Sequence, residues 1–296
     1  MMETFDRLFL YSTPLYIIII GIEILATFIY NKQYYSSKGT LTNIYLTGLN
    51  LSLGFLVRGF CVIVLIYFSQ FKLFEIKNVI AYWVLLLAFE DFLFYILHYV
   101  DHYCRFFWAV HVTHHSSEEF NLTVGFRSSV FEPLYAYFYF IPLVLCGFKP
   151  WDIMLMYSAT QIYGILIHTQ FIGKLGFVEW FMATPSNHRV HHGSNHQYLD
   201  KNMGMIFIIW DRIFGTYQSE EEVVRFGLTE NINTYHPAKV VFHEWENIWI
   251  DVKTAPTFGT KFMYIFGPPG WSHDGRKKTS RQLRAEWLAK QKNSAK

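Results

Sequence analysis

The sequence is poor in charged residues and in cysteine. Only 16% of its 296 residues are Asp, Glu, Lys or Arg, whereas soluble domains average about 25%. The three cysteines form no CxxC pair and provide no disulfide framework. No Lys/Arg run is interleaved with aromatic residues, so the pattern of a nucleic-acid groove is missing. A chain with so little charge cannot cover itself with polar surface, and we expect part of it to face lipid.

Apolar residues are abundant instead. Hydrophobic residues make up 52% of the chain and aromatic residues 20%. A membrane helix needs about 20 mostly apolar residues, and 14–30, 45–68 and 76–97 are such runs. A later apolar pair, 131–148 and 151–167, is divided by a Lys-Pro step and predicts a hairpin of two short or tilted helices. The sequence therefore predicts an all-α, polytopic membrane bundle with five membrane segments.

Two polar regions alternate with these runs. Residues 101–127 and the stretch from 184 onward lie on one side if the hairpin between them enters and leaves by one face. The C-terminal tail is strongly basic, and Lys32 and Lys38 fall on the same side as the tail. The positive-inside tendency assigns this side to the cytoplasm. We predict membrane helices in 1–75, a histidine-rich catalytic domain with membrane helices in 76–220, and a cytoplasmic region in 221–296.

Histidines are unusually frequent and clustered. His98 and His102 lie four residues apart at the end of the third apolar run, which places both on one helix face. Two further segments share the spacing HxxHH, at residues 111–115 and 188–192. Packing many imidazoles together is costly unless something pairs with their lone pairs, and a metal ion does so. The sequence therefore predicts a metal site beside the membrane segments, held in a cytoplasmic helical cap.

Carboxylates and isolated histidines complete the set of candidates. Asp91 lies seven residues before His98 on the same face, and we expect it to accept a hydrogen bond from a liganding imidazole. Glu90 is a weaker candidate for the same role. His168 stands alone after the membrane hairpin and is equally compatible with a ligand or a structural residue. His196 is better explained as a structural or surface residue. The same holds more strongly for the three remaining histidines, His236, His243 and His273.

The spacing of the histidines does not identify the metal. Imidazole binds Zn, Cu, Fe and Ni, but eight or nine ligands are too many for one tetrahedral zinc. They suit two metal ions with open positions for a small molecule. A haem or electron-transfer protein would need histidines that face each other from different spans, whereas these lie at span ends. A zinc hydrolase at the membrane surface is a further alternative.

Longer motifs surround the histidines. They are Asp91-x3-Tyr95-x2-His98-x3-His102, Trp108-x2-His111-x2-His114-His115 and His188-x2-His191-His192, followed by Asp200-Lys-Asn-Met-Gly and Ile209-Trp-Asp-Arg-Ile-Phe-Gly-Thr-Tyr217. This pattern resembles the membrane fatty acid hydroxylase/sterol desaturase superfamily over roughly residues 80–220. The segments 114–123, 167–169 and 184–193 most resemble its alkylglycerol monooxygenase branch. Two positions depart from many members: Tyr99 replaces Arg and Asn187 replaces His.

The resemblance implies a membrane-bound di-iron oxygenase that uses two Fe ions and O2 to hydroxylate a lipid C–H bond. If that carbon bears an ether oxygen, the product is a hemiacetal that collapses to an aldehyde and an alcohol. Lipid or sterol desaturation remains an alternative outcome. The chain shows no GxGxxG or haem-attachment motif, so electrons must come from an external donor such as tetrahydrobiopterin, ferredoxin or cytochrome b5. Glu119 and Asn121 are implied to lie near the metals. The implied metal ligands and catalytic residues are His98, His102, His111, His114, His115, His168, His188, His191 and His192.

Overall fold

The computed structural model describes the backbone of residues 2–294 and the side chains of residues 14–294. Its elements are helices, and the described residues contain no strand beyond two isolated bridges, Met182 with Phe207 and Gly193 with Phe226. The prediction of an all-α fold is therefore confirmed. The number of membrane crossings and the side on which the polar regions lie stay predictions.

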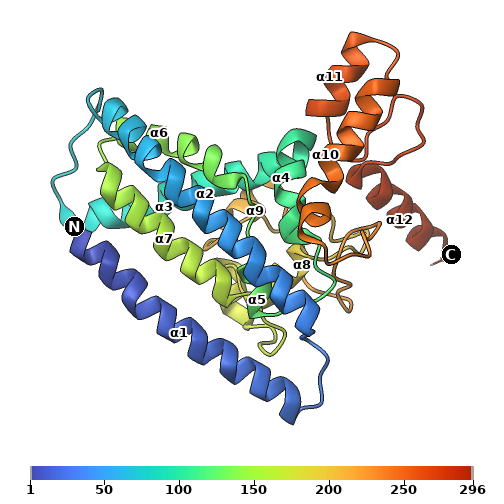
Figure 1. Ribbon diagram of the computed structural model, residues 1–296, viewed down its shortest axis with the longest axis horizontal. Coiled ribbons are helices and arrows are strands. Elements are labelled where there is room, and N and C mark those ends of the chain that lie inside the picture. Colours follow the sequence, from blue (N-terminus) through green and yellow to red (C-terminus); the bar gives the residue numbers. More distant parts are fainter. Residues whose placement is uncertain (1, 295–296) are drawn as a thin grey trace.

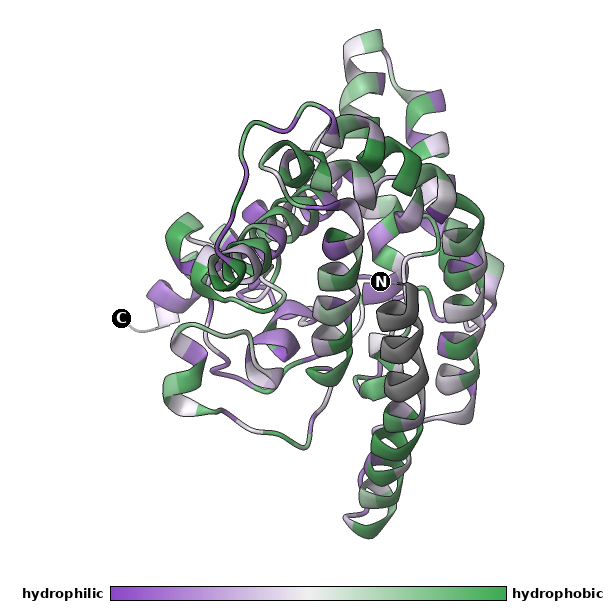
Figure 2. Cartoon of the chain, turned by 90° about the vertical axis from the view of Figure 1, so that its left-hand side faces the viewer, coloured by the Kyte–Doolittle hydropathy of each residue, from purple (hydrophilic) through white to green (hydrophobic). Residues whose placement is uncertain are grey.

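Long helices form one side of the molecule. They are α1 (Met2–Ile29), α2 (Ser37–Ser69), α3 (Val79–Tyr103) and α7 (Pro150–Leu166). Among the described residues, α2 and α3 are long and apolar enough to cross a membrane, and α1 contributes a shorter apolar stretch, Pro14–Ile29. Only 17% of the apolar window of α2 and 28% of that of α3 are buried inside the protein. Helices of this kind need an apolar solvent, which supports the prediction of a membrane protein (Figures 1 and 2).

The predicted fourth membrane segment, 131–148, is not one helix. It divides into η1 (Glu132–Leu134), η2 (Ala136–Phe140) and α6 (Ile141–Leu145). Pro133 and Pro142 lie in the first turns of η1 and α6, where proline starts a helix and cannot continue one from the preceding turn. These pieces pack with α2, α3 and α7 around a core that includes Leu65, Leu86 and Ile153.

Shorter helices gather at the end of the bundle where α3 and α7 finish. They are α4 (Arg105–His115), α5 (Leu122–Gly125), η3 (Gly176–Trp180), α8 (Pro185–His191) and α9 (Ile209–Phe214). The C-terminal helices α10 (Pro237–Thr254), α11 (Phe258–Phe266) and α12 (Ser280–Ser294) lie beyond α4, on the far side from the start of α1 (Figure 1). The predicted histidine segments thus fall on α3, α4 and α8 and on the turn after α7.

Local sequence explains the start of α8. Thr184 caps the helix and Pro185 occupies its first turn, as the sequence predicts for a short helix. Asn187, where the resemblance implies a histidine in many members, completes a capping box with Thr184. Its side chain therefore has a structural task, and the two histidines of α8 and His192 directly after it remain free to face the interior.

Candidate metal centre

All nine histidines implied by the sequence come together, in two groups. In each group the histidines offer one nitrogen apiece, and these nitrogens lie within 4.8 Å of one another. The five-histidine group comprises His98, His102, His111, His115 and His191, and the four-histidine group comprises His114, His168, His188 and His192. His196 is exposed and belongs to neither group.

Each HxxHH segment divides its histidines between the two groups. On a helix, residues four apart differ by about 40° in direction, whereas adjacent residues differ by about 100°. In α4 the pair His111 and His115 faces the five-histidine group, and His114 turns to the other group. In α8 the assignment is reversed: His188 and His192 face the four-histidine group and His191 the five-histidine group. The two short helices therefore place the groups side by side.

The distances between imidazole nitrogens match the edges of a metal coordination shell. In the five-histidine group, Nε2 of His111 lies 3.0 Å from Nε2 of His98 and 3.1 Å from Nε2 of His115. In the four-histidine group, Nε2 of His168 lies 2.9–3.3 Å from the Nε2 atoms of the other three, His188, His192 and His114. Nitrogens bound at roughly 2.1 Å to one ion would be about 3.0 Å apart in an octahedron and about 3.4 Å apart in a tetrahedron.

Backbone carbonyls fix which nitrogen of these rings carries the proton. The Nδ1 atoms of His98, His114, His168 and His191 lie 2.7–3.0 Å from the carbonyl oxygens of Met203, Arg127, Gly164 and Lys201. A carbonyl oxygen only accepts, so Nδ1–H donates and the Nε2 atom keeps a lone pair. His114 and His168 are both fixed in this way, and their Nε2 lone pairs face each other at 3.3 Å.

Such an arrangement needs a cation. Two lone pairs repel, and neither imidazole has a proton to donate to the other. Among the described residues, the buried Nε2 atoms of His102 and His191 have no hydrogen-bond partner either. Buried nitrogen acceptors are normally satisfied, and a metal ion accepts several lone pairs at once. The donor set, the distances and the unpaired atoms therefore fit one metal ion in each histidine group.

Burial keeps the imidazoles neutral, which is the form that binds metal. Burial lowers the pKa of His168 to about 4. It also lowers the pKa well below the ordinary range for His111, His114, His115, His188, His191 and His192, and the neighbouring histidines lower it further. Near neutral pH these rings carry no positive charge, so a metal ion meets lone pairs without first having to displace protons.

Asp91 has a different partner from the one predicted. Its carboxylate is fully buried and accepts from the backbone N–H groups of Ile206 and Phe207 and from the indole N–H of Trp210. No hydrogen bond of the described residues joins it to an imidazole, because it lies two helical turns before His98. Asp91 instead holds the segment whose Met203 carbonyl orients His98.

Glu119 and Asn121 act on the backbone and not on the histidines. Glu119 accepts from the N–H of Ser36, the residue that caps α2. Asn121 caps α5 by accepting from the N–H of Thr123, and its amide donates to the carbonyl of Tyr34. In the described residues neither side chain forms a hydrogen bond with an imidazole of the two groups. Both side chains thus help to fix helix starts, and their implied position near the metals stays a prediction.

Three carboxylates that sequence reasoning did not assign lie close to the histidines or bond the segment that orients them. Asp101 Oδ2 lies 3.8 Å from Nδ1 of His111, and Asp200 Oδ1 lies 3.4 Å from Nδ1 of His102. Asp211 accepts from the N–H groups of Met203 and Gly204. The signal was present in part, since Asp101 lies between the two histidines of the HxxxH segment and Asp200 and Asp211 lie within the quoted downstream motifs.

Arg127 also supports the site and was not predicted. Its buried guanidinium donates to the carbonyl of Thr113, to Asn43 and to Ser116, while its own carbonyl accepts from His114. It therefore joins α2 to the C-terminal half of the α4 histidine segment. A single arginine in a polar stretch gives no sequence signal for this role.

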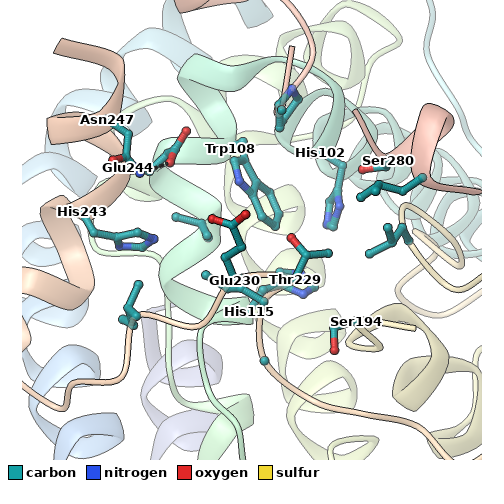
Figure 3. A pocket seen from close by; sticks show the side chains of 18 of the residues that line it. His102, Trp108, His115, Ser194, Thr229, Glu230, His243, Glu244, Asn247 and Ser280 are labelled. Atoms are coloured by element: carbon teal, nitrogen blue, oxygen red, sulfur yellow. Dashed lines mark hydrogen bonds between the residues drawn. The ribbon is translucent and has the colours of Figure 1, made fainter. Parts of the chain in front are cut away.

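A cavity of about 720 Å³ reaches the five-histidine group from the polar side. Its lining includes His102, His115 and the indole of Trp108, which lies between α10 and these histidines (Figure 3). The outer wall is polar and comes from 227–247 and 269–283, with Glu230, Glu244 and others. His196 and His243 line the cavity without joining a histidine group.

A known family model matches the part of the chain that contains the grouped histidines. Residues 83–216 match the model of the fatty acid hydroxylase family, and this stretch contains all nine grouped histidines. This stretch is similar to the fatty acid hydroxylase family, as the motif pattern predicted.

Similar proteins include alkylglycerol monooxygenases and a sterol desaturase. The chain is 43% identical over 182 residues to alkylglycerol monooxygenase from Homo sapiens, which covers 61% of this chain and 40% of that protein. It is 39% identical over 191 residues to the same enzyme from Xenopus tropicalis, with 64% and 42% covered. A Delta(7)-sterol 5(6)-desaturase, erg3C from Aspergillus fumigatus, is 24% identical over 159 residues, with 47% and 48% covered. The chain thus matches about two fifths of the length of these monooxygenases. No solved structure matches the chain.

Proposed function

We propose that this protein is a membrane-bound, non-haem di-iron oxygenase that hydroxylates a lipid C–H bond with O2. The observation that carries the proposal is the pair of histidine groups, in which backbone carbonyls turn Nε2 lone pairs toward one another. The similarity to the fatty acid hydroxylase family supports the reaction class. Two iron ions bound to these nitrogens would supply the activation of O2.

The residues of the chain have separate tasks in this proposal. The five-histidine group holds one ion and the four-histidine group holds the other. The carbonyls of Met203, Arg127, Gly164 and Lys201 keep the rings oriented and neutral. Burial of most of the histidines leaves the cavity lined by His102 and His115 as a polar approach to the centre. One oxygen atom enters the lipid and the other leaves as water, so an external donor must supply two electrons, for which tetrahydrobiopterin, ferredoxin or cytochrome b5 are the candidates.

We propose an alkyl ether lipid as the substrate. The support is the name of the relatives that share 39–43% identity with the chain, alkylglycerol monooxygenase. Hydroxylation of the carbon next to the ether oxygen would give a hemiacetal, which collapses to a fatty aldehyde and a free alcohol. Desaturation is the second candidate, and the similarity to a sterol desaturase at 24% identity favours it less. A single-site zinc hydrolase does not use nine histidines in two groups.

We also propose that the metal centre faces the cytoplasm in a multi-pass protein. One support is the shared position of the histidines at the ends of α3 and α7. The other is the basic residues, which are Lys32 after α1, Lys38 at the start of α2 and those of the C-terminal tail. Protease or cysteine-labelling accessibility of the tail in sealed vesicles tests this assignment.

The reaction is tested with the purified protein in lipid nanodiscs. It is given a panel of ether lipids, sterols and acyl lipids, a reductant and 18O2, and products are reduced with borohydride and measured by mass spectrometry. We expect one 18O atom in the alcohol derived from the fatty aldehyde. An 18O-free double bond would favour desaturation.

Metal analysis provides the independent measurement. We expect about two iron ions per chain, since each histidine group fits one ion. One zinc ion and no iron, or a strong Soret band in the absorption spectrum, would overturn the di-iron assignment.

A further inference from the structure

The helices α10 and α11 form a hairpin with an exposed aromatic face. On α11, Phe258, Phe262 and Phe266 follow one another at intervals of four residues and lie on one side of the helix, with Phe258 85% and Phe262 53% exposed. Tyr264 is buried on the opposite side. On α10, Trp249 is 60% exposed. Large aromatic side chains exposed on both helices of one hairpin indicate an interaction surface.

Contacts with α4 fix the position of this hairpin relative to the membrane-capable helix α3. The last residue of α3 is Tyr103, and the N–H of Arg105 donates to the carbonyl of Gly267, directly after α11. The guanidinium of Arg105 is buried and forms ion pairs with Glu244 and Asp251 of α10. Both helices of the hairpin are therefore held at the level where the apolar span α3 ends, which is the level of a membrane–water interface.

Aromatic contacts continue the same apolar surface from α4 to α11. The ring of Phe106 stacks on Phe266 at 5.8 Å and meets Trp245 of α10 at 5.2 Å. In Figure 1 the hairpin projects from the body of the molecule beside α4. An aromatic surface at this level, continuous with the end of a span, has lipid as its nearest neighbour.

The positively charged residues of the hairpin also favour lipid as the neighbour of this surface. Lys253 lies over the ring of Trp249 at 4.7 Å, and Lys261 lies on α11 between the exposed phenylalanines. Lysine and tryptophan side chains at an interface keep their polar ends in water while their apolar parts enter the lipid. Amphipathic helices with Phe and Trp on one face and lysine nearby bind in the plane of a bilayer surface.

We propose that the α10–α11 hairpin lies in the interfacial layer of the bilayer that α3 enters, with Phe258 and Phe262 inserted among the lipids. The other side of α10 bears Lys239, His243 and Asn247, which line the cavity over the five-histidine group. The hairpin therefore separates lipid on one side from the polar cavity on the other. This inference rests on the position of α3 in a membrane and is independent of the reaction proposed above.

Fluorescence quenching in nanodiscs tests the proposal with the full chain. Cys61, Cys104 and Cys146 are first changed to Ala, and single cysteines are then introduced by Phe258→Cys or Phe262→Cys and labelled with NBD. Matched controls are Asn247→Cys on the cavity side of α10 and Gln291→Cys on α12. Nanodiscs contain phosphatidylcholine with or without a doxyl group near the headgroup, and iodide serves as the quencher in water. Unchanged thermal unfolding shows that each variant folds.

The two quenchers give opposite expectations. With the label at position 258 or 262 we expect loss of emission with doxyl-labelled lipid and little loss with iodide. At positions 247 and 291 we expect the reverse. Iodide quenching at 258 and 262 equal to that at 291, with no doxyl effect, would overturn the proposal. Protection from both quenchers, together with disulfide cross-linking of two chains through Phe258→Cys, would assign the surface to a second copy and would also overturn it.

Discussion

Replacing Asp91 separates its role in the structure from that of its neighbour Glu90. Both carboxylates are fully buried in α3. Asp91 accepts three hydrogen bonds, at 2.8, 3.0 and 2.9 Å, from Ile206, Phe207 and Trp210. Glu90 accepts one, at 3.2 Å from Thr160, and its Oε2 atom has no hydrogen-bond partner among the described residues. The variants Asp91→Asn and Glu90→Gln are therefore a matched pair.

The expected loss follows from the donors that Asp91 satisfies. An asparagine keeps one acceptor oxygen but directs an amide N–H group at a backbone N–H donor. Hydrogen bonds to a charged group contribute about 1.5–3 kcal/mol, and a buried donor left unpaired costs about 1–3 kcal/mol. We expect Asp91→Asn to lower the free energy of unfolding by about 2–4 kcal/mol. Glu90→Gln keeps the size of the side chain and its only hydrogen bond, so we expect a change within about 1 kcal/mol.

Thermal unfolding in nanodiscs measures the difference. A loss of 1 kcal/mol lowers Tm by roughly 2–4 °C in chains of a few hundred residues, so we expect Asp91→Asn to lower Tm by roughly 5–15 °C. Iron content should fall as well, because the anchored segment carries the Met203 carbonyl that orients His98. Equal Tm values for Asp91→Asn and Glu90→Gln would refute this reasoning.

Three further predictions concern the centre itself. His168→Ala removes the nitrogen that approaches three others in the four-histidine group, so we expect about one of two metal ions to be lost by elemental analysis, whereas His196→Ala should retain both. Gly125→Ala would place a Cβ 2.9 Å from Ile165 Cα and 3.0 Å from His168 Nδ1, so we expect the free energy of unfolding to fall by about 1–3 kcal/mol. The matched control Gly173→Ala should show no loss, because its Cβ would meet nothing within 4 Å. Equal unfolding curves for the two variants would contradict this. Burial lowers the pKa of His168 from 6.5 to about 4, so below pH 6.5 the unfolded chain binds a proton that the folded chain does not. The metal-free protein should therefore lose about 3 kcal/mol from this residue as the pH falls from 6.5 to 4, and a Tm independent of pH in that window would count against a buried neutral His168.

The sequence was sufficient for the histidines because their spacing carries geometry. Residues four apart lie on one face of a helix, and His98 with His102, His111 with His115, and His188 with His192 each meet in one group as that rule predicts. The rule could not show that His114 and His115 enter different groups, because this depends on how α4 packs against α8 and α7. His168 gave no pattern of its own and was reached through the family resemblance.

Residues that support the site from a distance were harder to predict. Glu119 and Asn121 were placed near the metals by resemblance, and which groups they bond was not predictable. Glu119 accepts from the N–H of Ser36, the cap residue of α2, and Asn121 caps α5, because a polar side chain near a histidine in sequence can point toward any backbone donor nearby. Glu23, by contrast, was not predicted to lie near the site. It lies in an apolar run far from the motifs, yet it accepts from the N–H of Leu122 and from Thr169, next to His168. Contacts between distant segments of this kind have no local sequence signal.

The opposed lone pairs of the metal centre make the stability of the folded protein depend on metal. Because backbone carbonyls hold His114 and His168 with Nε2 atoms facing each other, folding without metal leaves this repulsion in place, and metal binding removes it. Metal supply is then coupled to folding. In iron-starved cells we expect the chain itself to become scarcer, because the metal-free form is more often opened and degraded.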